Sequence, residues 1–403
     1  MKNILVAQSG GPTAAINATL AGVITCAYSS GITGKVLGSC NGIQGVLEER
    51  FVDLRDKVQS AQEMDLLCQT PAAALGSCRL KLTEEQQYEQ IVEVLRRNQI
   101  NCFIYIGGND SMDTVHKLSV YCSEHGIDDI SVIGAPKTID NDLMGTDHCP
   151  GFGSAAKYIA ATFSELERDC HVYTMKAVTI VEVMGRNAGW LTAASALARS
   201  NGAKGPNLIY LCETDFDNSK FIADVKRELE TCDSVVVAIS EGIKDKDGRY
   251  VSEQVQSSVV DNFGHSYIAG SAKVLENLVR DEIGCKVRSI ELNLMQRCAA
   301  HIASAVDIQE SKMLGMKACQ AALEGETGKM AAVIRKGDAP YTVTYETVPV
   351  SQVANAEKKV PADFITPDGH DVTDKMINYL KPLIQGENTV IYENGIPKHL
   401  ALY

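Results

Sequence analysis

The sequence predicts an α/β fold made of two doubly wound domains, each built on a parallel sheet. Short β-rich runs alternate with segments of helical periodicity, and strands separated by helices pair in parallel sheets that are covered on both faces. Glycine follows three of the runs, at Gly10, Gly107 and Gly185. Open α/β sheets bind ligands beyond the carboxyl ends of their strands, so these glycines mark predicted ligand loops. A chain of 403 residues is long enough for two domains of ordinary size.

The first two predicted units set this pattern. Residues 3–7 form a strand, which a Ser-Gly-Gly turn joins to an alanine- and isoleucine-rich helix over about residues 13–28. The second unit begins with a helix at Thr83, because Thr83 and Gln86 form a capping-box pair. It continues into a strand over 102–106, which ends in two glycines and leads into another helix.

The rest of the chain supplies more strands and a change of pattern. Further β-rich runs are predicted strands at residues 131–135, 178–183, 208–211 and 235–239. After about Met330, two alternating runs at 330–334 and 341–350 predict a hairpin joined by residues 336–340, and a helix follows over about 372–384. The composition contains no proline-, glycine- or serine-rich linker that would mark a domain boundary.

The overall charge excludes some classes of ligand. A net charge of −13 and a pI near 5.2 argue against a nucleic-acid or anionic-membrane binder, which needs a broad basic surface. The apolar run before the first glycine is too short for a signal peptide or a membrane span, so a cytoplasmic location is expected. The 13 cysteines form no CxxC pair and no zinc-finger spacing, and we expect them to be reduced and packed as small apolar residues.

The segment Ile106–Ser111 has the composition of a phosphate loop. Its two glycines let the backbone approach a phosphate, and the helix that begins near Ser111 offers unpaired amides to it. The polar side chains of Asn109 and Asp110 are candidate ligands for Mg²⁺. A capped glycine turn at an ordinary helix start is the alternative interpretation.

The segment Pro136–Asp142 also follows a buried strand. It places two carboxylates, Asp140 and Asp142, two residues apart. Lys137 and Thr138 precede them, which is a density of polar groups that a plain turn does not need. A carboxylate here can accept the proton of an attacking hydroxyl group, as the catalytic aspartate does in other phosphoryl transfers. The alternative is an Asn-Asp turn with solvated charges.

A third cluster, Val181–Trp190, is another strand-to-helix turn. Its Arg186 could dock a phosphate or a sugar, whereas Met184 and Trp190 alone would indicate core. The remaining candidates are isolated charged residues at strand or loop ends, each also explained as a surface charge: Arg79, Glu241, Arg288 and Arg297.

Taken together and in this order, the motifs resemble the phosphofructokinase family. The segments AQSGG, LGSCR, GGNDS, PKTIDND, EVMGRNAGW and AISEG occur in the family's order at sensible spacings, and the likeness extends to about residue 320. The resemblance implies two phosphofructokinase-like domains with the active site in the cleft between them. It assigns residues 1–150, with about 296–330, to a phosphoryl-donor domain. It assigns residues 151–295, with part of 331–403, to a sugar-phosphate domain.

The resemblance also implies a catalytic group. Asp140 would be the base that deprotonates the C1 hydroxyl of fructose 6-phosphate, with Lys137 and Asp110 beside it. The residues expected to bind the sugar are Thr138, Ile139, Met184, Gly185, Arg186 and Glu241.

The remaining implied roles concern phosphate groups. Gly10, Gly11 and Arg79 would contact the diphosphate donor. Arg288 and Arg297 would hold the 6-phosphate, one of them reaching across from a neighbouring subunit. A homodimer or homotetramer with a shared active site is therefore implied.

Two positions indicate the phosphoryl donor. ATP-using relatives carry glycine where this chain has Asp110 and again where it has Lys137. A charged side chain at Asp110 would intrude on the α-phosphate of a nucleotide and repel it. Lys137 can place its ammonium group on the terminal phosphate of pyrophosphate, where charge builds during transfer. The resemblance thus implies the pyrophosphate-dependent branch, which runs reversibly in glycolysis and gluconeogenesis.

Three positions depart from the family's pattern. Asn109 stands where many relatives have an aspartate associated with Mg²⁺, and a neutral amide is a weaker ligand than a carboxylate. Ligation would then pass to Asp110, Asp142 or water. Leu294 replaces a substrate-contacting histidine, and Lys176 lies one residue from an expected basic position, so the 6-phosphate site is the least defined.

Two other functions stay open. The first is an ATP-dependent 6-phosphofructokinase of unusual sequence, against which Lys137 and Asp110 argue. The second is a non-catalytic regulatory subunit of the same fold. Such a subunit would lose the base or a phosphate ligand, whereas Asp140, Arg186 and Glu241 are all present.

Overall fold

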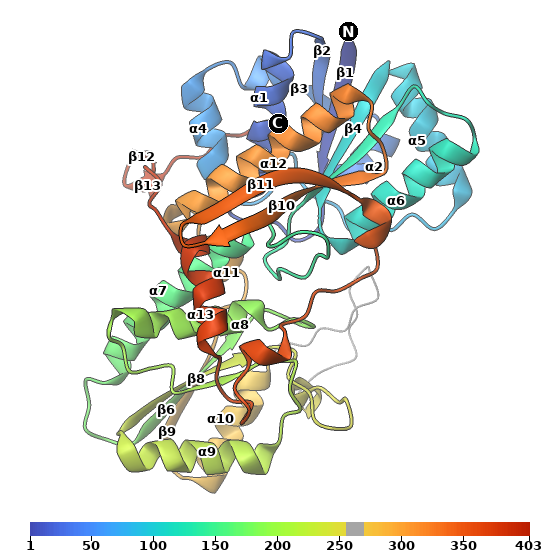
Figure 1. Cartoon of the computed structure of the whole chain (residues 1–403). Helices are drawn as coiled ribbons and strands as arrows, with labels where there is room; N and C mark the ends of the chain where they lie inside the picture. The colour runs from blue at the N-terminus through green and yellow to red at the C-terminus, as the bar shows by residue number, and fades with distance from the viewer. Residues whose placement is uncertain (255–269) are drawn as a thin grey trace. The chain divides into compact units, whose positions relative to one another are not determined.

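The structure is a computed structural model that describes residues 1–254 and 270–403 (Figure 1). The chain forms two compact units. Unit 1 comprises Met1–Ser154, Arg297–Glu357 and Gly386–Tyr403, and unit 2 comprises Ala155–Gln296 and Lys358–Gln385. Within the described ranges, no helix is both long enough and apolar enough to cross a membrane.

Unit 1 is built on a seven-stranded sheet in the order β11-β10-β5-β4-β1-β2-β3. Its five central strands are parallel, whereas the edge strands β3 and β11 are antiparallel to their neighbours. The strands are β1 (Lys2–Gln8), β2 (Thr33–Ser39), β3 (Phe51–Asp53), β4 (Ile100–Gly107), β5 (Ser131–Pro136), β10 (Lys329–Asp338) and β11 (Tyr341–Pro349).

Helices cover both faces of this sheet. Ile4 and Val6 of β1 join one core cluster with α1 and α12, while Leu5 and Ala7 join another with α5 and α6, because successive side chains of a strand point to opposite faces. The helices are α1 (Ile16–Ser29), α2 (Gly42–Leu47), α3 (Leu54–Lys57), α4 (Ala61–Gln69), α5 (Glu85–Arg97), α6 (Asn109–Glu124) and α12 (Ala305–Glu324).

The helices α1 and α12 pack side by side at glycine contacts (Figure 1). A Cβ atom on Gly22 would lie 1.9 Å from the Lys312 carbonyl oxygen, and one on Gly315 would lie 1.9 Å from the Thr19 carbonyl oxygen. Both positions therefore exclude a side chain. This contact anchors α12, which begins eight residues after Arg297, against the amino-terminal βα unit.

Unit 2 is built on a four-stranded, fully parallel sheet in the order β7-β8-β6-β9. Its strands are β6 (Ala177–Val183), β7 (Leu208–Tyr210), β8 (Ser234–Ser240) and β9 (Lys286–Glu291). Its helices are α8 (Trp190–Ala194), α9 (Asn218–Thr231), α10 (Ser271–Glu282) and α13 (Asp374–Leu380). The helices α7 (Phe152–Cys170) and α11 (Met295–Cys298) span the division between the units.

The α/β class and all the predicted strands are confirmed, with three corrections of detail. The capping box of α5 uses Glu84 and Gln87, one residue later than predicted. The first hairpin strand does not end at residue 334 but runs to Asp338, with a register shift between Arg335 and Gly337. The sheet of unit 1 is mixed at its edges rather than parallel throughout, since β3 and β11 pair antiparallel with β2 and β10.

Two further elements differ from expectation at the carboxyl end of the chain. The helix predicted to extend to residue 384 is α-helical only to Leu380 and continues as a 3₁₀-helix over Lys381–Ile384. The segment Gly386–Tyr403 returns to unit 1, where the buried side chain of Leu402 joins the core beside α1. It contains the short strands β12 (Tyr392–Glu393) and β13 (Ile396–Pro397).

Candidate functional site

The motif loops of unit 1 follow three neighbouring strands. The strands β1, β4 and β5 are adjacent and parallel. Gln8 at the end of β1 pairs with Ile106 of β4. Gly107 at the end of β4 pairs with Pro136 of β5. Because these carboxyl ends meet at one edge of the sheet, the loops that follow them converge.

Lys137 lies against the first glycine turn. Its side chain is buried, and its Nζ donates a hydrogen bond to the Gly11 carbonyl at 2.7 Å. Gly10 has a φ of +77°, and a Cβ atom there would lie 3.2 Å from the Lys137 Nζ, so backbone conformation and space both favour glycine. Burial lowers the pKa of Lys137 to about 8, with the charge of Asp140 acting in the opposite direction. An ammonium has three N–H donors, and the bond to Gly11 uses one.

The loop that carries Asp140 is tied to neighbouring backbone. Lys137 N donates to the Gly107 carbonyl at 2.9 Å, and Thr138 N donates to the Pro150 carbonyl at 3.2 Å. Asp140 N donates to the Thr138 hydroxyl at 3.1 Å. Thr138 and Asp140 are half-buried, whereas Ile139 is buried. The side chain of Ile139 therefore packs in the protein.

Asn109 has a structural role. Its Oδ1 accepts a hydrogen bond from Asn355 N at 2.9 Å, and its Nδ2 donates to the Ala356 carbonyl at 2.9 Å. Asn355 in turn donates from Nδ2 to Asp113 at 2.9 Å. The Asn109 amide thus clamps the start of α6 to the segment after the β10–β11 hairpin. Its assignment as a metal ligand stays a prediction, and this geometry favours Asp110 instead.

Asp110 and Arg79 lie at the periphery of the same loops. Asp110 is exposed in the first turn of α6, where a negative charge is favoured by the helix dipole. The loop that carries Arg79 is tied to the glycine turn, because the Ser77 hydroxyl donates to the Gly10 carbonyl at 2.6 Å. Arg79 itself is exposed.

A second group of predicted residues forms at the carboxyl edge of the sheet in unit 2. Met184, Gly185 and Arg186 follow β6, and Glu241 follows the neighbouring strand β8. Gly185 N donates to Glu241 Oε1 at 3.3 Å. A Cβ atom on Gly242 would lie 1.9 Å from the Arg186 carbonyl oxygen. The two turns therefore touch.

The electrostatics of this group suit a polar ligand. Burial raises the pKa of Glu241 to about 7, against the hydrogen bond from Gly185 and the charge of Arg186. Burial likewise raises the pKa of Glu182, on the same strand end, to about 7. The Arg186 Nε is buried and has no hydrogen-bond partner among the residues that the structure describes. An acceptor brought by a ligand would satisfy it, since unpaired buried donors are costly.

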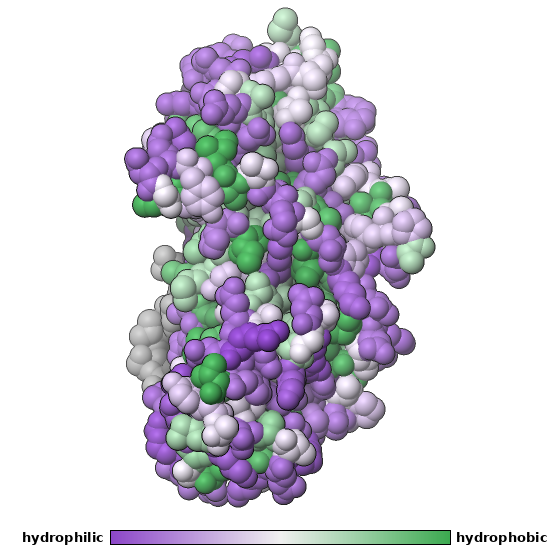
Figure 2. All heavy atoms as spheres, turned by 90° about the vertical axis from the view of Figure 1, so that its left-hand side faces the viewer, coloured by the Kyte–Doolittle hydropathy of each residue, from purple (hydrophilic) through white to green (hydrophobic). Residues whose placement is uncertain are grey.

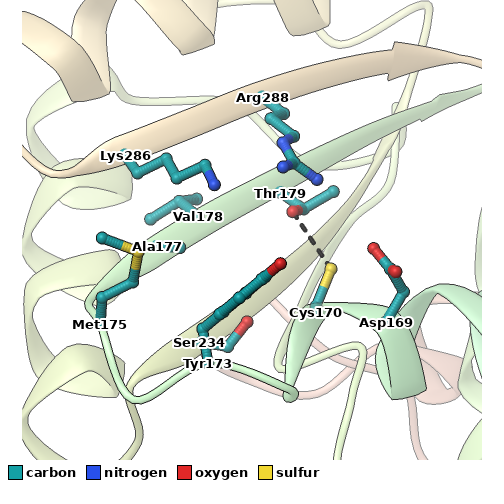
Figure 3. Close-up of a pocket in the computed structure, with 10 residues that line it drawn as sticks. All are labelled: Asp169, Cys170, Tyr173, Met175, Ala177, Val178, Thr179, Ser234, Lys286 and Arg288. Carbon is teal, nitrogen blue, oxygen red and sulfur yellow. Dashed lines mark hydrogen bonds between the residues drawn. The ribbon is translucent and has the colours of Figure 1, made fainter.

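Arg288 does not belong to this group within one chain. It pairs with Thr179 in the amino-terminal half of β6, five residues before Met184. It lines a pocket that includes Tyr173, Met175 and Lys286 (Figure 3). The Lys286 Nζ lies 5.5 Å from the centre of the Tyr173 ring. Figure 3 shows both cationic side chains extending from β9 over this pocket.

Arg297 belongs to unit 1. A Cβ atom on Gly11 would lie 3.1 Å from its Nη1, so its guanidinium group sits against the same glycine turn as Lys137. Its positive charge also contributes to the lowered pKa of Lys137. The structure thus groups Arg297 with predicted donor residues, and its contact with the 6-phosphate stays a prediction.

Sequence patterns missed the residues that support these turns. Gln296, which is buried, accepts a hydrogen bond from Met184 N at 3.2 Å. Glu213 accepts from Gly189 N at 2.9 Å and from Val360 N at 3.0 Å. Each partner is distant in sequence, so no local pattern could have identified the pair.

Comparison with known proteins identifies the family. The family model described as Phosphofructokinase matches residues 3–322. The chain belongs to the phosphofructokinase family. Curated relatives named pyrophosphate–fructose 6-phosphate 1-phosphotransferase, from Halomonas elongata and Xanthomonas campestris, are each 42% identical to this phosphofructokinase. The alignments cover 98% and 99% of this chain and 95% and 96% of the relatives.

Solved structures agree with this membership. A pyrophosphate-dependent phosphofructokinase from Nitrosospira multiformis superposes with a TM-score of 0.90 at 38% sequence identity, covering 99% of this chain and 96% of that chain. A second, from Marinobacter aquaeolei, gives a TM-score of 0.88 at 37% identity, covering 99% and 96%. The predicted fold and family are therefore confirmed.

The role of Asn109 can be tested by replacing it with aspartate. The variant Asn109→Asp keeps an acceptor for Asn355 N but turns a carboxylate toward the Ala356 carbonyl, so we expect the free energy of unfolding to fall by about 1–2 kcal/mol. We expect the Mg²⁺ concentration for half-maximal activity to stay unchanged. Asn218→Asp, at the exposed first residue of α9, is the matched control. A several-fold lower Mg²⁺ requirement in Asn109→Asp would instead place a metal ligand at this position.

Proposed function

We propose that this protein transfers a phosphoryl group from pyrophosphate to the C1 hydroxyl of fructose 6-phosphate, reversibly, giving fructose 1,6-bisphosphate and phosphate. The observation that carries the proposal is the buried Lys137 ammonium at the Gly10–Gly11 turn. The reaction belongs to glycolysis and gluconeogenesis.

Lys137 supports pyrophosphate as the donor. Its Nζ occupies the space that a Gly10 side chain would need, so it stands where the backbone is open to a phosphate. Arg297 adds a second cation at Gly11. Two cations at one turn suit a compact, highly charged anion, because its charge is balanced where it is greatest during transfer. Asp110, exposed at the adjacent helix start, would repel the α-phosphate of a nucleotide.

Asp140 is the proposed base. Its carboxylate takes the proton of the C1 hydroxyl, and the C1 oxygen then forms a bond to the near phosphorus atom of pyrophosphate. The bond from that phosphorus to the bridging oxygen breaks, and phosphate leaves. The hydrogen bond from Asp140 N to the Thr138 hydroxyl restrains the backbone that carries this carboxylate, which favours the positioned base that general-base catalysis requires.

The sugar phosphate is proposed to bind to the residues of unit 2. The unsatisfied Arg186 Nε offers a donor to a sugar or phosphate oxygen. Glu241, whose pKa is raised to about 7, can hydrogen-bond a sugar hydroxyl. Met184 and Gly185 supply the backbone of the same turn. Thr138 and Ile139 of unit 1 complete the proposed set.

Mg²⁺ is the proposed cofactor. Among the residues that the structure describes, no group of three or more His, Cys, Asp or Glu residues could hold a metal ion. The exposed Asp110 carboxylate nevertheless fits Mg²⁺, which binds through one or two carboxylates and keeps water and substrate phosphates as its other ligands. When bound, Mg²⁺ would neutralise charge on the pyrophosphate. Because the phosphates of the donor would supply several ligands of Mg²⁺, the protein does not need to supply all of them.

The oligomer is also a proposal. Large apolar side chains are exposed beside the pocket in Figure 3, with Val172 63%, Tyr173 62% and Met175 52% exposed. On the face shown in Figure 2, hydrophilic residues cover most of the surface and apolar residues form separate groups. Exposed apolar clusters mark interaction surfaces. We propose that a second copy of the chain covers this apolar cluster and that Arg288 of one copy contacts the sugar-phosphate site of the other. The proposed location of this oligomer is the cytoplasm.

The donor is tested by measuring fructose 1,6-bisphosphate formation with pyrophosphate, ATP and ADP side by side. We expect turnover with pyrophosphate to exceed that with ATP by at least about tenfold. The double variant Lys137→Gly with Asp110→Gly should lose pyrophosphate activity and gain ATP use, because it removes the cation and opens space at the helix start. Faster turnover of ATP by the unmodified protein would identify an ATP-dependent enzyme, and turnover of neither donor would identify a regulatory subunit.

The base is tested with Asp140→Asn. The amide keeps the shape of the carboxylate but cannot take a proton, so kcat should fall by about a hundredfold or more, while the Kd for fructose 6-phosphate stays within about threefold of the unmodified value. Stopped-flow or equilibrium titration supplies the Kd. The control Asp128→Asn changes an exposed carboxylate of unit 1 that has no proposed role. A near-normal kcat in Asp140→Asn would remove this residue from the mechanism.

The oligomer is tested by sedimentation. We expect the unmodified protein to sediment as a dimer or tetramer. Tyr173→Asp combined with Met175→Asp should dissociate it and reduce activity, since charges would be buried in the interface. Tyr392→Asp, at a residue 56% exposed in unit 1, is the matched control. A monomer with full activity would contradict the shared site.

A further inference from the structure

We infer that His148 is a positioning residue for the reaction: a cation clamped between two carboxylates, Asp147 and Glu310, which holds the loop that carries Asp140. The inference rests on the proposed role of Asp140 as the base. The motifs that identified the family contain neither His148 nor Glu310, and neither residue belongs to the catalytic group proposed above.

The loop over residues 138–151 is closed at its base and cross-tied a few residues further along. Thr138 bridges to Gly151, which brings the two ends of the loop together. Asn141 is buried with a φ of +56°, and its Oδ1 accepts a hydrogen bond from Cys149 N at 3.0 Å. Asn141 follows Asp140 and Cys149 follows His148. The cross-tie therefore joins the immediate neighbours of the base and of the histidine.

Both ring nitrogens of His148 face carboxylates. Nδ1 lies 2.9 Å from Asp147 Oδ2, and Nε2 lies 2.5 Å from Glu310 Oε2. The side chain is only 3% exposed. A carboxylate can only accept, so both contacts are hydrogen bonds only when both nitrogens carry protons, as in the imidazolium form. Burial by itself lowers the pKa of His148, but the hydrogen bonds to Asp147 and Glu310 outweigh it and raise the pKa to about 9.

Other charged and titratable groups complete the surroundings of this cation. The Tyr341 hydroxyl on β11 donates to Glu310 Oε1 at 2.8 Å. The Arg335 Nη1 on β10 lies 3.8 Å from Asp147 Oδ2. Asp307, one helical turn before Glu310 on α12, is buried, and this burial raises its pKa against the hydrogen bonds from Ser154 and Gly151 and the charge of His148. Each carboxylate beside His148 thus has a second partner, which holds it in place.

The same helix also holds the far end of the loop. Asp307 Oδ1 accepts from Gly151 N at 3.0 Å, and its Oδ2 accepts from Ser154 N at 2.9 Å. Asp307 and Glu310 share a face of α12 because they are three residues apart. The second half of the loop is also bound to β10, since Asp147 N donates a hydrogen bond to the Val333 carbonyl at 2.9 Å. Helix and hairpin together determine where residues 146–151 lie.

A neutral His148 would weaken this arrangement. One of its nitrogens would then present a lone pair to a carboxylate, and the loop would lose one of its two charged ties. Small displacements of a catalytic group are costly to rate, so a shift at Cys149 that reaches Asp140 through Asn141 should lower kcat. Because the pKa of His148 is raised in the folded protein, its contribution to stability is full below about pH 6.5 and is lost as the pH rises through about 9.

The test compares kcat and its pH profile in Glu310→Gln and in the unmodified protein, with whichever phosphoryl donor is turned over. Glu310→Gln removes one of the two carboxylates, so the alkaline fall of kcat should move to lower pH by at least about one unit, and kcat at pH 8 should fall about tenfold. KM values should stay within about threefold. Burial and the charges of Asp140, Arg297 and Asp142 shift the pKa of Lys137. Lys137 therefore titrates in both proteins, and the difference between the two profiles reports on His148. Glu167→Gln, at a carboxylate paired with His171 in unit 2, is the matched control for Glu310→Gln.

A measurement on the unmodified protein keeps the inference testable if the variants fail to fold. The ¹⁵N chemical shifts of His148, assigned by comparison with His148→Gln or by selective labelling, should report a doubly protonated ring up to about pH 8. A neutral ring at pH 7 would overturn the inference, whatever the donor or the base proves to be. A folded Glu310→Gln variant with an unchanged kcat and pH profile would overturn it too, leaving a contribution to stability alone.

Discussion

The structure of unit 1 depends on accommodating the ammonium group of Lys137 in a buried position. An isolated charge is expensive to remove from water, and the cost here shows as a pKa lowered to about 8. What holds the charge is the Gly11 carbonyl and the nearby negative charge of Asp140. A glycine at position 10 leaves the room the ammonium needs. The SGG turn, the GGNDS loop and the PKTIDND loop are thus parts of one electrostatic arrangement.

Helix α12 contacts both α1 and the loop that carries Asp140. It packs on α1 through backbone contacts that only glycine allows. From its opposite side, Asp307 and Glu310 reach the segment that returns from the Asp140 loop. A helix distant in sequence therefore connects the amino-terminal glycine turn to the loop of the base. Rigid elements that hold a loop from two sides position catalytic groups more precisely than the loop could alone.

The hydrogen bonds of the Asn109 side chain change how the GGNDS loop is interpreted. An amide at that position suggested a weakened metal site, but the side chain uses both its atoms on Asn355 and Ala356. The loop is thereby tied to residues that follow the β10–β11 hairpin. The hairpin supports the loop of the base through Val333, and the segment that follows the hairpin supports the phosphate loop through Asn355.

The sequence by itself determined the α/β class, the strands that precede each motif, and the family, because periodicity and glycine turns are local properties. It also placed Lys137, Asp140 and Gly10 in loops that follow strands, and their roles at a site stay predictions. Only the tertiary structure showed that Asn109 is a clamp, that Arg297 lies at Gly11, that Arg288 lies away from Arg186 within one chain, and that Glu310 holds His148. Each of these depends on a contact between residues far apart in the chain, and such a contact leaves no periodic pattern in the sequence.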